Sequence, residues 1–274
     1  MTSATIAYDN FSITPIYAFS DNYIWCLHDN EKAWVVDPGD HEVVETFLKQ
    51  NNLSLEGILI THHHWDHTNG IKSLLQDRDI PVYGPEHAKV PAISHLMNEG
   101  DEVTLFGTSF NVLEVPGHTL DHIAYAANNV ASSDNNAMNN ILFCGDTLFS
   151  AGCGRLFEGS PEQMHTSMQK LSALGEDTLV FCTHEYTESN LKFAQAVEPQ
   201  NSDITNELRR VQSLNVSIQP SLPSSIAKEK AINPFLRTHL PSVKKQAAEA
   251  MSLEADKLDE IECFAAVRRW KDSF

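Results

Sequence analysis

The segment THHHWDHTNG, residues 61–70, gathers four histidines and an aspartate directly after the apolar run 57–60. Their spacing does not follow one face of a helix, where residues three or four apart lie together, so we expect a loop that turns into a helix. Imidazole nitrogens and carboxylate oxygens are protein ligands of zinc, iron and manganese. The pattern therefore predicts a metal-binding loop rather than a histidine-rich surface segment. Its predicted ligands are His62, His64, Asp66 and His67.

Three further residues of ligand type each follow a predicted strand after a short turn: His118, Asp146 and His184. The strands that precede them are the apolar runs at residues 112–115, 141–144 and 179–182. If these strands end at one edge of a sheet sandwich, their ligands meet in one pocket with the loop at residues 61–70. The chain thus offers seven ligands for a single site.

Seven ligands exceed the need of one catalytic zinc ion, which takes three protein groups and a water. Two divalent ions fit the number. The predicted division places His62, His64 and His118 around one ion and Asp66, His67 and His184 around the other, with Asp146 able to bridge them. The absence of a thiolate in this set disfavours a purely structural zinc site, so we expect zinc first, with iron or manganese as alternatives.

The elements that must hold this set alternate strands with helical patterns. Apolar runs predict strands at residues 13–17, 23–27, 33–36 and 57–60, and helical spacing predicts a helix around residues 43–48. This rhythm is typical of the α/β class, with sheets covered by helices. The Asn-rich residues 128–140 are interpreted as a surface hairpin loop without chemistry.

After residue 186 the chain becomes mostly helical, interrupted by a Pro- and Ser-rich stretch at 219–225. We therefore predict a catalytic domain over residues 1–186 and a helical domain over residues 187–274. At 274 residues the chain is long enough for a large domain with a smaller companion.

The overall charge limits the partners that we consider. With 19 Lys and Arg against 37 Asp and Glu, the formal net charge is −18. A protein this acidic repels nucleic acid and anionic membranes, so we expect neither as a partner. Five widely spaced cysteines without a CxxC pair, and no export signal or membrane-length apolar segment, predict a reduced, cytoplasmic protein. A monomer is expected.

The motifs resemble those of a known family. The succession THxHxDH, GHT, GDTLF and a late histidine is similar to the metallo-β-lactamase superfamily signature. More narrowly, the chain resembles the glyoxalase II (hydroxyacylglutathione hydrolase) family over nearly its whole length. The matching segments are DNYIW (21–25), VVDPGD (35–40), CGDTLFSAGCGRLFEG (144–159), HEYTESNLKFA (184–194) and VRRWKD (267–272).

The resemblance implies an αββα sandwich with a C-terminal, mostly helical domain. It implies hydrolysis of S-D-lactoylglutathione and related 2-hydroxyacyl glutathione thioesters to glutathione and a 2-hydroxy acid, the second step of methylglyoxal detoxification. The seven metal ligands carry over one for one, with a hydroxide between the two ions as nucleophile and no protein nucleophile. Glutathione contacts are implied at Arg155, Tyr186, Arg268 and Lys271.

Two residues depart from the family pattern. Phe157 stands where some members have tyrosine, which removes one hydrogen bond to the tripeptide. Asp121 occupies a position where glycine is usual, so its carboxylate either alters the metal preference or faces solvent. His63, between two ligands, is expected to point away from them. Asp37 either orients a histidine ligand or stabilises the turn in which it lies.

Other functions are compatible with these sequence motifs. One is another hydrolase of the same fold, a thioesterase, lactonase or β-lactamase, although Asp146 replaces the cysteine ligand of many β-lactamases. A second is a persulfide dioxygenase with a single iron, which needs neither the full ligand set nor the helical tail. A nuclease is disfavoured by the net charge. A non-enzymatic zinc module would have a closed site, whereas seven ligands for two ions leave coordination positions open.

Overall fold

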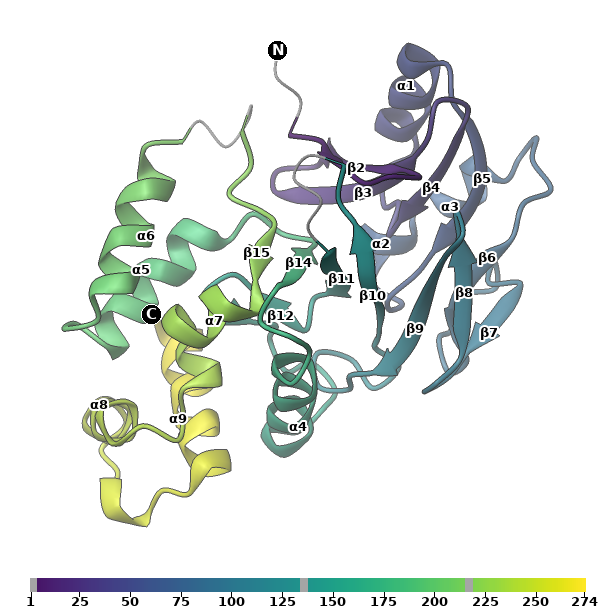
Figure 1. The fold of residues 1–274 in the computed structure, drawn as a ribbon. Coiled ribbons are helices and arrows are strands. Elements are labelled where there is room, and N and C mark those ends of the chain that lie inside the picture. The colour runs from purple at the N-terminus through teal and green to yellow at the C-terminus, as the bar shows by residue number, and fades with distance from the viewer. Residues whose placement is uncertain (1–3, 134–137, 215–218) are drawn as a thin grey trace. The chain divides into compact units, whose positions relative to one another are not determined.

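The computed structural model describes residues 4–133, 138–214 and 219–274 (Figure 1). The chain forms two compact units. The first comprises residues 1–114, 121–145 and 179–184, and the second comprises residues 115–120, 146–178 and 185–274. Among the described residues, no helix is both long enough and apolar enough to cross a membrane.

The first unit contains a seven-stranded sheet in the order β1-β2-β3-β4-β5-β6-β7. Strands β2 and β3 form an antiparallel hairpin, whereas β4, β5 and β6 run parallel, with the helix α1 connecting β4 to β5. Its strands are β1 (Ile6–Ala7), β2 (Ser12–Ala18), β3 (Asn22–His28), β4 (Lys32–Val36), β5 (Ser54–Leu59), β6 (Val82–Pro85) and β7 (His95–Met97). Its helices are α1 (His41–Asn51), α2 (Trp65–Thr68) and α3 (Ile71–Leu74).

A second sheet belongs to the same unit, and its strands there follow the order β14-β11-β10-β9-β8. The strands are β8 (Glu102–Leu105), β9 (Thr108–Glu114), β10 (Ile123–Ala131), β11 (Met138–Gly145) and β14 (Thr178–Cys182). The two sheets pack face to face. The Trp25 ring of β3 lies 5.0 Å from Phe181 of β14, and its indole nitrogen donates to the Cys182 carbonyl.

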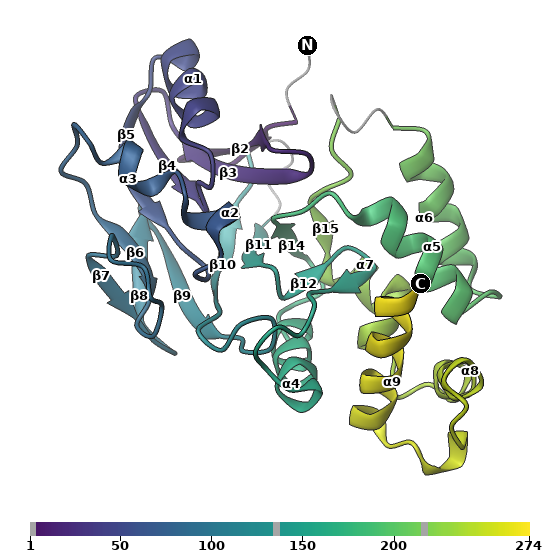
Figure 2. The same cartoon turned by 180° about the vertical axis from the view of Figure 1, so that it is seen from behind.

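The residues of β3 alternate between two apolar layers, which explains why this strand has no polar face. Trp25 points into the layer between the sheets, while Ile24 and Cys26 join the core that α1 and α3 cover. Both helices lie on that face of the first sheet and contact each other (Figure 2). Because a strand buried on both faces reads as a continuous apolar run, the strand predictions at residues 13–17, 23–27, 33–36 and 57–60 are confirmed.

The interpretation of residues 128–140 as a loop is wrong over most of its length. Strand β10 continues to Ala131 and β11 begins at Met138, and these two residues pair with each other. Residues 134–137 lie outside the described residues. The Asn-rich composition misled the prediction because exposed positions at the end of a hairpin tolerate polar side chains while the ladder supplies the backbone hydrogen bonds.

The second unit is mainly helical, as predicted for the C-terminal part of the chain. Its helices include a pair formed by α5 and α6, and α9 contacts both α4 and α8. They are α4 (Pro161–Ser172), α5 (Thr187–Val197), α6 (Ser202–Gln212), α7 (Ile226–Ile232), α8 (Pro241–Met251) and α9 (Glu260–Ser273), with 3-10 turns η1 (Pro234–Leu236) and η2 (Ala255–Lys257). Its short strands are β12 (Leu148–Phe149), β13 (Gly152–Cys153) and β15 (Ser224–Ser225).

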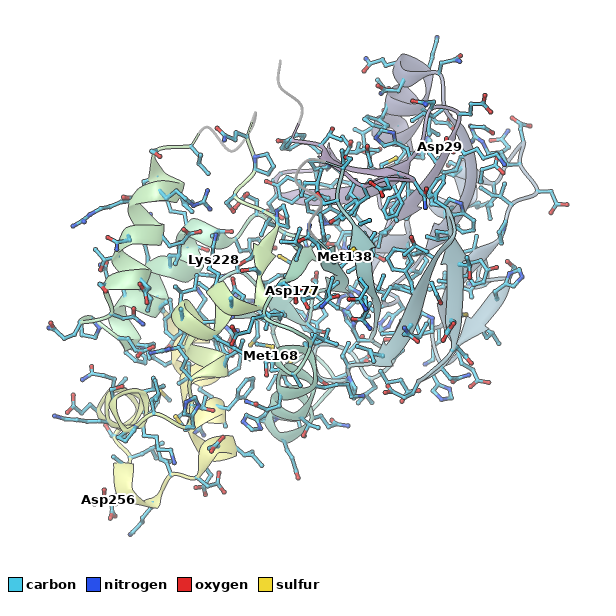
Figure 3. All side chains as sticks on the ribbon, viewed as in Figure 1. Asp29, Met138, Met168, Asp177, Lys228 and Asp256 are labelled. Carbon is cyan, nitrogen blue, oxygen red and sulfur yellow. The ribbon has the colours of Figure 1, made fainter. Side chains whose placement is uncertain are left out.

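Helix α4 was not among the predicted elements, although its start carries a recognisable signal. Ser160 and Gln163 form a capping box, in which each side chain accepts the other residue's backbone N–H, and Pro161 occupies the first helical turn. Met168 lies on the buried side of this helix (Figure 3). Met164, Met168 and Leu171 recur at helical spacing and are buried, so this helix could have been predicted from both its cap and its periodicity.

Candidate metal centre

The ligand loop begins where strand β5 ends, and it turns into the helix α2 at Trp65, as predicted. His62 and His64 precede the helix, and the Nε2 atom of His62 lies 3.1 Å from the Nδ1 atom of His64. His62 is fully buried and His64 is half-buried. The loop thus brings two imidazole nitrogens to within the spacing of neighbouring ligands on one ion.

A second group of donors in the same unit consists of Asp66, His67 and His184, the last from the end of β14. The Oδ2 atom of Asp66 lies 3.5 Å from the Nε2 atoms of both His67 and His184. Ligands about 2.1 Å from a tetrahedral ion are about 3.4 Å apart, so these distances match the edges of a coordination polyhedron. All three donor atoms lie within 4.8 Å of one another. The residues present therefore fit a divalent cation.

A buried carboxylate orients His67. The Oδ2 atom of Asp37 lies 2.9 Å from Nδ1 of His67 and also accepts from the Thr61 hydroxyl at 2.7 Å. The Thr61 backbone N–H donates to the other carboxylate oxygen at 2.8 Å. Because a carboxylate can only accept, Nδ1 of His67 must carry the proton, which leaves the Nε2 lone pair for a metal. Of the two roles considered for Asp37, this geometry supports the orienting one.

His184 is oriented in the same way by a residue that the sequence analysis did not assign. The Oδ1 atom of Asp21 lies 2.7 Å from Nδ1 of His184. The next residue, Asn22, donates its amide to Oδ2 of Asp66 at 3.2 Å. Both residues stand at the start of β3, within the motif DNYIW. The motif was recognised, but the contacts it makes were not predictable, because they join segments far apart in the sequence.

The second unit holds the other two predicted ligands near each other. The Nε2 atom of His118 lies 3.4 Å from Oδ2 of Asp146, again the spacing of two ligands on one ion. Nδ1 of His118 lies 2.8 Å from the Arg155 carbonyl, to which it can only donate, so Nε2 is again free of its proton. A side chain at Gly154 would come within 2.0 Å of the Asp146 carbonyl oxygen, so only glycine permits this approach.

The predicted glutathione-binding cations also belong to the second unit. Arg268, on α9, is 5% exposed; its guanidinium donates to the Cys153 carbonyl and to Asp272, both at 2.9 Å. Lys271, one turn later, lies with its ammonium 5.0 Å from the centre of the Phe193 ring. Burial, followed by the neighbouring Arg268 charge, lowers the pKa of Lys271 to about 8.

Arg155 and Tyr186 complete the predicted set in this unit. The Arg155 side chain is 69% exposed, and its Nε atom lies 3.9 Å from Oδ1 of Asp272, a contact that solvent weakens strongly. The Tyr186 ring lies edge-on to the Phe149 ring, with the ring centroids 5.4 Å apart, and Tyr186 occupies the N-cap position of α5. Arg155, Arg268 and Lys271 thus share Asp272 as a neighbour, which concentrates positive charge in an otherwise acidic protein.

Comparison with known proteins decides the family. The family model for the metallo-beta-lactamase superfamily matches residues 19–184, and the model for the hydroxyacylglutathione hydrolase C-terminus matches residues 185–274. Hydroxyacylglutathione hydrolases of Pseudomonas fluorescens SBW25 and Hahella chejuensis KCTC 2396 are each 48% identical to this chain, over 265 and 263 residues, which is 96% of this chain and 99% of theirs. The chain belongs to the hydroxyacylglutathione hydrolase family.

Solved structures confirm the fold of this hydroxyacylglutathione hydrolase family member. The crystal structure of ETHE1 from Myxococcus xanthus superposes with a TM-score of 0.59 at 25% identity, covering 81% of this chain and 83% of that one. The B3 metallo-beta-lactamase BLEG-1 has a TM-score of 0.55 at 23% identity, covering 82% and 99% respectively. The predicted metallo-β-lactamase fold with a helical C-terminal region and the predicted divalent-metal site are therefore confirmed.

Within this family member, one of the two departures from the family pattern can now be placed. Asp121 is only 8% exposed, so the alternative that it faces solvent is wrong. Its Oδ1 atom lies 2.9 Å from Nδ1 of His63, the histidine between two ligands. Phe157, by contrast, is 63% exposed and lies edge-on to the His118 ring at 5.3 Å. His122 is buried, with 1% of its surface exposed.

Proposed function

We propose that this member of the family hydrolyses S-D-lactoylglutathione and related 2-hydroxyacyl glutathione thioesters, releasing glutathione and a 2-hydroxy acid such as D-lactate. The observation that carries the proposal is the match of residues 185–274 to the hydroxyacylglutathione hydrolase C-terminus. That segment carries the buried cation Arg268 and the half-buried cation Lys271. The relatives that match the chain over this tail are named hydroxyacylglutathione hydrolases, which disfavours a lactonase, a different thioesterase or a persulfide dioxygenase.

We further propose a centre of two divalent ions, zinc first, with the seven predicted ligands. Chain connectivity supports it: Asp146 is bonded directly to the last residue of β11, and His118 lies in a short segment between the end of β9 and the start of β10. The ligands are divided as His62, His64 and His118, then Asp66, His67 and His184, with Asp146 shared. Within each unit the donor atoms that meet are 3.1–3.5 Å apart.

When bound, such ions lower the pKa of a coordinated water toward neutrality and so supply hydroxide at pH 7. The residues of this chain prepare that chemistry. Asp37 and Asp21 accept from Nδ1 of His67 and His184, which favours the tautomers whose Nε2 lone pairs would bind the ions. No serine, cysteine or threonine is assigned as nucleophile. Water adds to the thioester carbonyl, the carbon–sulfur bond breaks, and the leaving thiolate of glutathione needs little protonation because thiol pKa values lie near ~8.5.

The two carboxylates of glutathione require cations, and we propose Arg155, Lys271 and Arg268 for them, with Tyr186 as a further contact. Arg155 is exposed and offers a planar fork, while Lys271 offers a point charge. Arg268 is held by Cys153 and Asp272, but its buried Nε atom has no hydrogen-bond partner among the described residues. A substrate carboxylate would satisfy this donor, whose isolation otherwise costs stability.

The test is the loss of thioester ultraviolet absorbance with S-D-lactoylglutathione and with a lactoyl thioester of N-acetylcysteamine, which lacks the glutathione carboxylates. We expect rapid hydrolysis of the first and a KM higher by about tenfold or more for the second. The variant Arg155→Ala with Lys271→Ala should raise KM for the glutathione thioester and leave the second substrate nearly unaffected. Arg269→Ala, an exposed arginine on the same helix, is the matched control.

Hydrolysis of both thioesters at equal efficiency would overturn the glutathione assignment and leave a general thioesterase. A protein that binds metal but hydrolyses neither would favour a lactonase. The expectations of a cytoplasmic location, of a monomer and of a boundary at residues 186 and 187 stay predictions.

A further inference from the structure

We infer that residues 121–123 position the metal-ligand loop, and that the pair His63 and Asp121 is the polar contact through which they do so. Neither residue is a ligand in the proposed centre, so both are positioning residues. The inference rests on the metal centre of the proposed function. It concerns the alignment of His62 and His64, the two ligands on either side of His63.

Three successive residues of one segment contact three successive residues of the other. The backbone N–H of Ile123 donates to the Thr61 carbonyl at 2.9 Å. The His122 ring stacks on the His62 ring with centroids 4.5 Å apart and planes 17° from parallel. Asp121 then meets His63 at 2.9 Å. A backbone contact, a ring contact and a carboxylate contact thus fix the loop at its first three residues.

The stacking contact has little freedom, because the backbone of Gly145 closes over it. A side chain at Gly145 would come within 2.4 Å of the Thr61 hydroxyl and 2.8 Å of Cε1 of His122. His62 and His122 are 0% and 1% exposed. Packing this close transmits any shift of His122 directly to the ligand His62.

The Asp121 contact is the side-chain hydrogen bond of this register. A carboxylate that is 8% exposed is costly unless it is paired. Its Oδ2 atom is buried without a hydrogen-bond partner among the described residues, and Oδ1 lies within hydrogen-bond distance of the His63 side chain. His63 itself remains 32% exposed. Removing either partner should therefore free the start of the loop, whereas a coincidental surface contact would be dispensable.

The experiment measures metal affinity by competition with a chromophoric chelator, using zinc, in the full chain. The variants are His63→Ala, Asp121→Ala, the double variant, and His87→Ala as a control at an exposed histidine. We expect each single variant to weaken the affinity for at least one ion by about tenfold or more, the range known for residues that orient ligands. The double variant should bind zinc no more weakly than the weaker-binding single variant, because all three variants lose the same contact.

Two further readouts separate positioning from general destabilisation. Cobalt(II) reconstitution should give an altered visible absorption spectrum in His63→Ala and Asp121→Ala, because ligand geometry changes, and an unaltered one in His87→Ala. His63→Gln, which retains a donor, should recover part of the affinity. Should a single variant fail to fold, Asp121→Asn, which retains the acceptor at Oδ1, is measured instead and should lie between wild type and Asp121→Ala.

Zinc affinities within twofold of wild type in both single variants, with unchanged cobalt spectra, would overturn the inference while leaving the proposed function intact. If the losses of zinc-binding free energy in the two single variants add up in the double variant, the inference is also overturned, because additivity means that the two residues act independently. A wild-type protein that binds no zinc or cobalt would instead overturn the metal centre of the proposed function.

Discussion

At the scale of single residues, each orienting contact leaves an imidazole nitrogen ready for a metal. Asp37 and Asp21 accept from the Nδ1 atoms of His67 and His184, and a backbone carbonyl accepts from His118. A histidine with one nitrogen fixed in this way has its tautomer and ring plane set before any ion binds. The cost of arranging the ligands is therefore met during folding, which favours tight metal binding.

Asp37→Asn should weaken metal affinity by about 10–100-fold with little change in the fold. Asparagine is nearly isosteric and tolerates the left-handed backbone of this position, where φ is 53°. Its amide offers only one acceptor oxygen, so either the Thr61 backbone N–H loses its acceptor at Oδ1 or His67 and the Thr61 hydroxyl lose theirs at Oδ2. Chelator competition measures the affinity, and Asp29→Asn on an exposed turn is the control. An unchanged affinity would show that the Asp37 charge does not orient His67.

The lowered pKa of Lys271, about 8, predicts the pH dependence of substrate binding. Above this pH the ammonium loses its proton and its attraction for a carboxylate, so KM for the glutathione thioester should rise between about pH 7.5 and 9.5. Lys271→Arg should remove the rise, because arginine stays charged throughout this range. Steady-state kinetics across this range provide the test, and a KM that stays flat in wild type would exclude Lys271 from carboxylate binding.

At the scale of elements, the helix α7 holds the β12–β13 hairpin through a buried carboxylate. Glu229 is 0% exposed; it accepts from the Ala151 backbone at 2.7 Å, from Asn233 at 3.0 Å and from the Ser224 hydroxyl. Asn233 also donates to the carbonyls of Phe149 and Gly152. Since this hairpin leads directly into the segment of Arg155, the network connects helix packing to a cation proposed to bind substrate.

Glu229→Ala should lower the free energy of unfolding by about 1–3 kcal/mol, because several buried donors lose their acceptor. Glu229→Gln should cost about 1 kcal/mol or less, since its amide oxygen can accept from Ala151 and Asn233 while its N–H₂ turns to the Ser224 oxygen. Urea unfolding followed by circular dichroism gives both values. Equal losses in the two variants would mean that the charge, and not the hydrogen bonds, stabilises the hairpin.

At the scale of the whole molecule, positive charge is local in an acidic protein. The chain carries a formal charge of −18, yet Arg155, Arg268 and Lys271 share the neighbour Asp272. Such a distribution disfavours long polyanions and favours a small anion that reaches the cations directly. An acidic chain carries many carboxylates that could attract cations weakly. The histidine-rich centre differs from these carboxylates by its buried, oriented nitrogens rather than by its charge.

Metal removal should destabilise the whole protein. Ions that bind the folded state alone stabilise it by about 4 kcal/mol at a concentration 1,000 times the dissociation constant. For a chain of this size the melting temperature should fall by on the order of 10 °C in chelator, with activity lost together and both restored by zinc. Differential scanning calorimetry with and without chelator provides the measurement. An unchanged melting temperature would mean that the ligands bind no ion tightly.

The sequence by itself predicted the ligands and was enough to identify the family. Two local patterns carried this prediction: the HxHxDH spacing, and a histidine or aspartate shortly after an apolar run. They are local because a residue that follows a strand lies at the end of that strand however the rest of the chain folds. The strands at residues 13–17, 23–27, 33–36 and 57–60 could be predicted from their apolar runs, whereas β8 alternates buried and exposed residues and was not predicted. Helix α4 was missed although its sequence carries a capping box and helical spacing, and the length of the β10–β11 hairpin was missed because Asn-rich residues are typical of loops.

Only the tertiary structure decided which residues hold those ligands in place. Asp21 lies 163 positions from His184, Asp121 lies 58 positions from His63, and Asp37 lies 30 positions from His67. Nothing in the local sequence of an aspartate tells which histidine it will meet, because that depends on how the strands and turns pack. A ligand can be read from its own neighbourhood in the chain, whereas the residue that orients it is chosen by the fold.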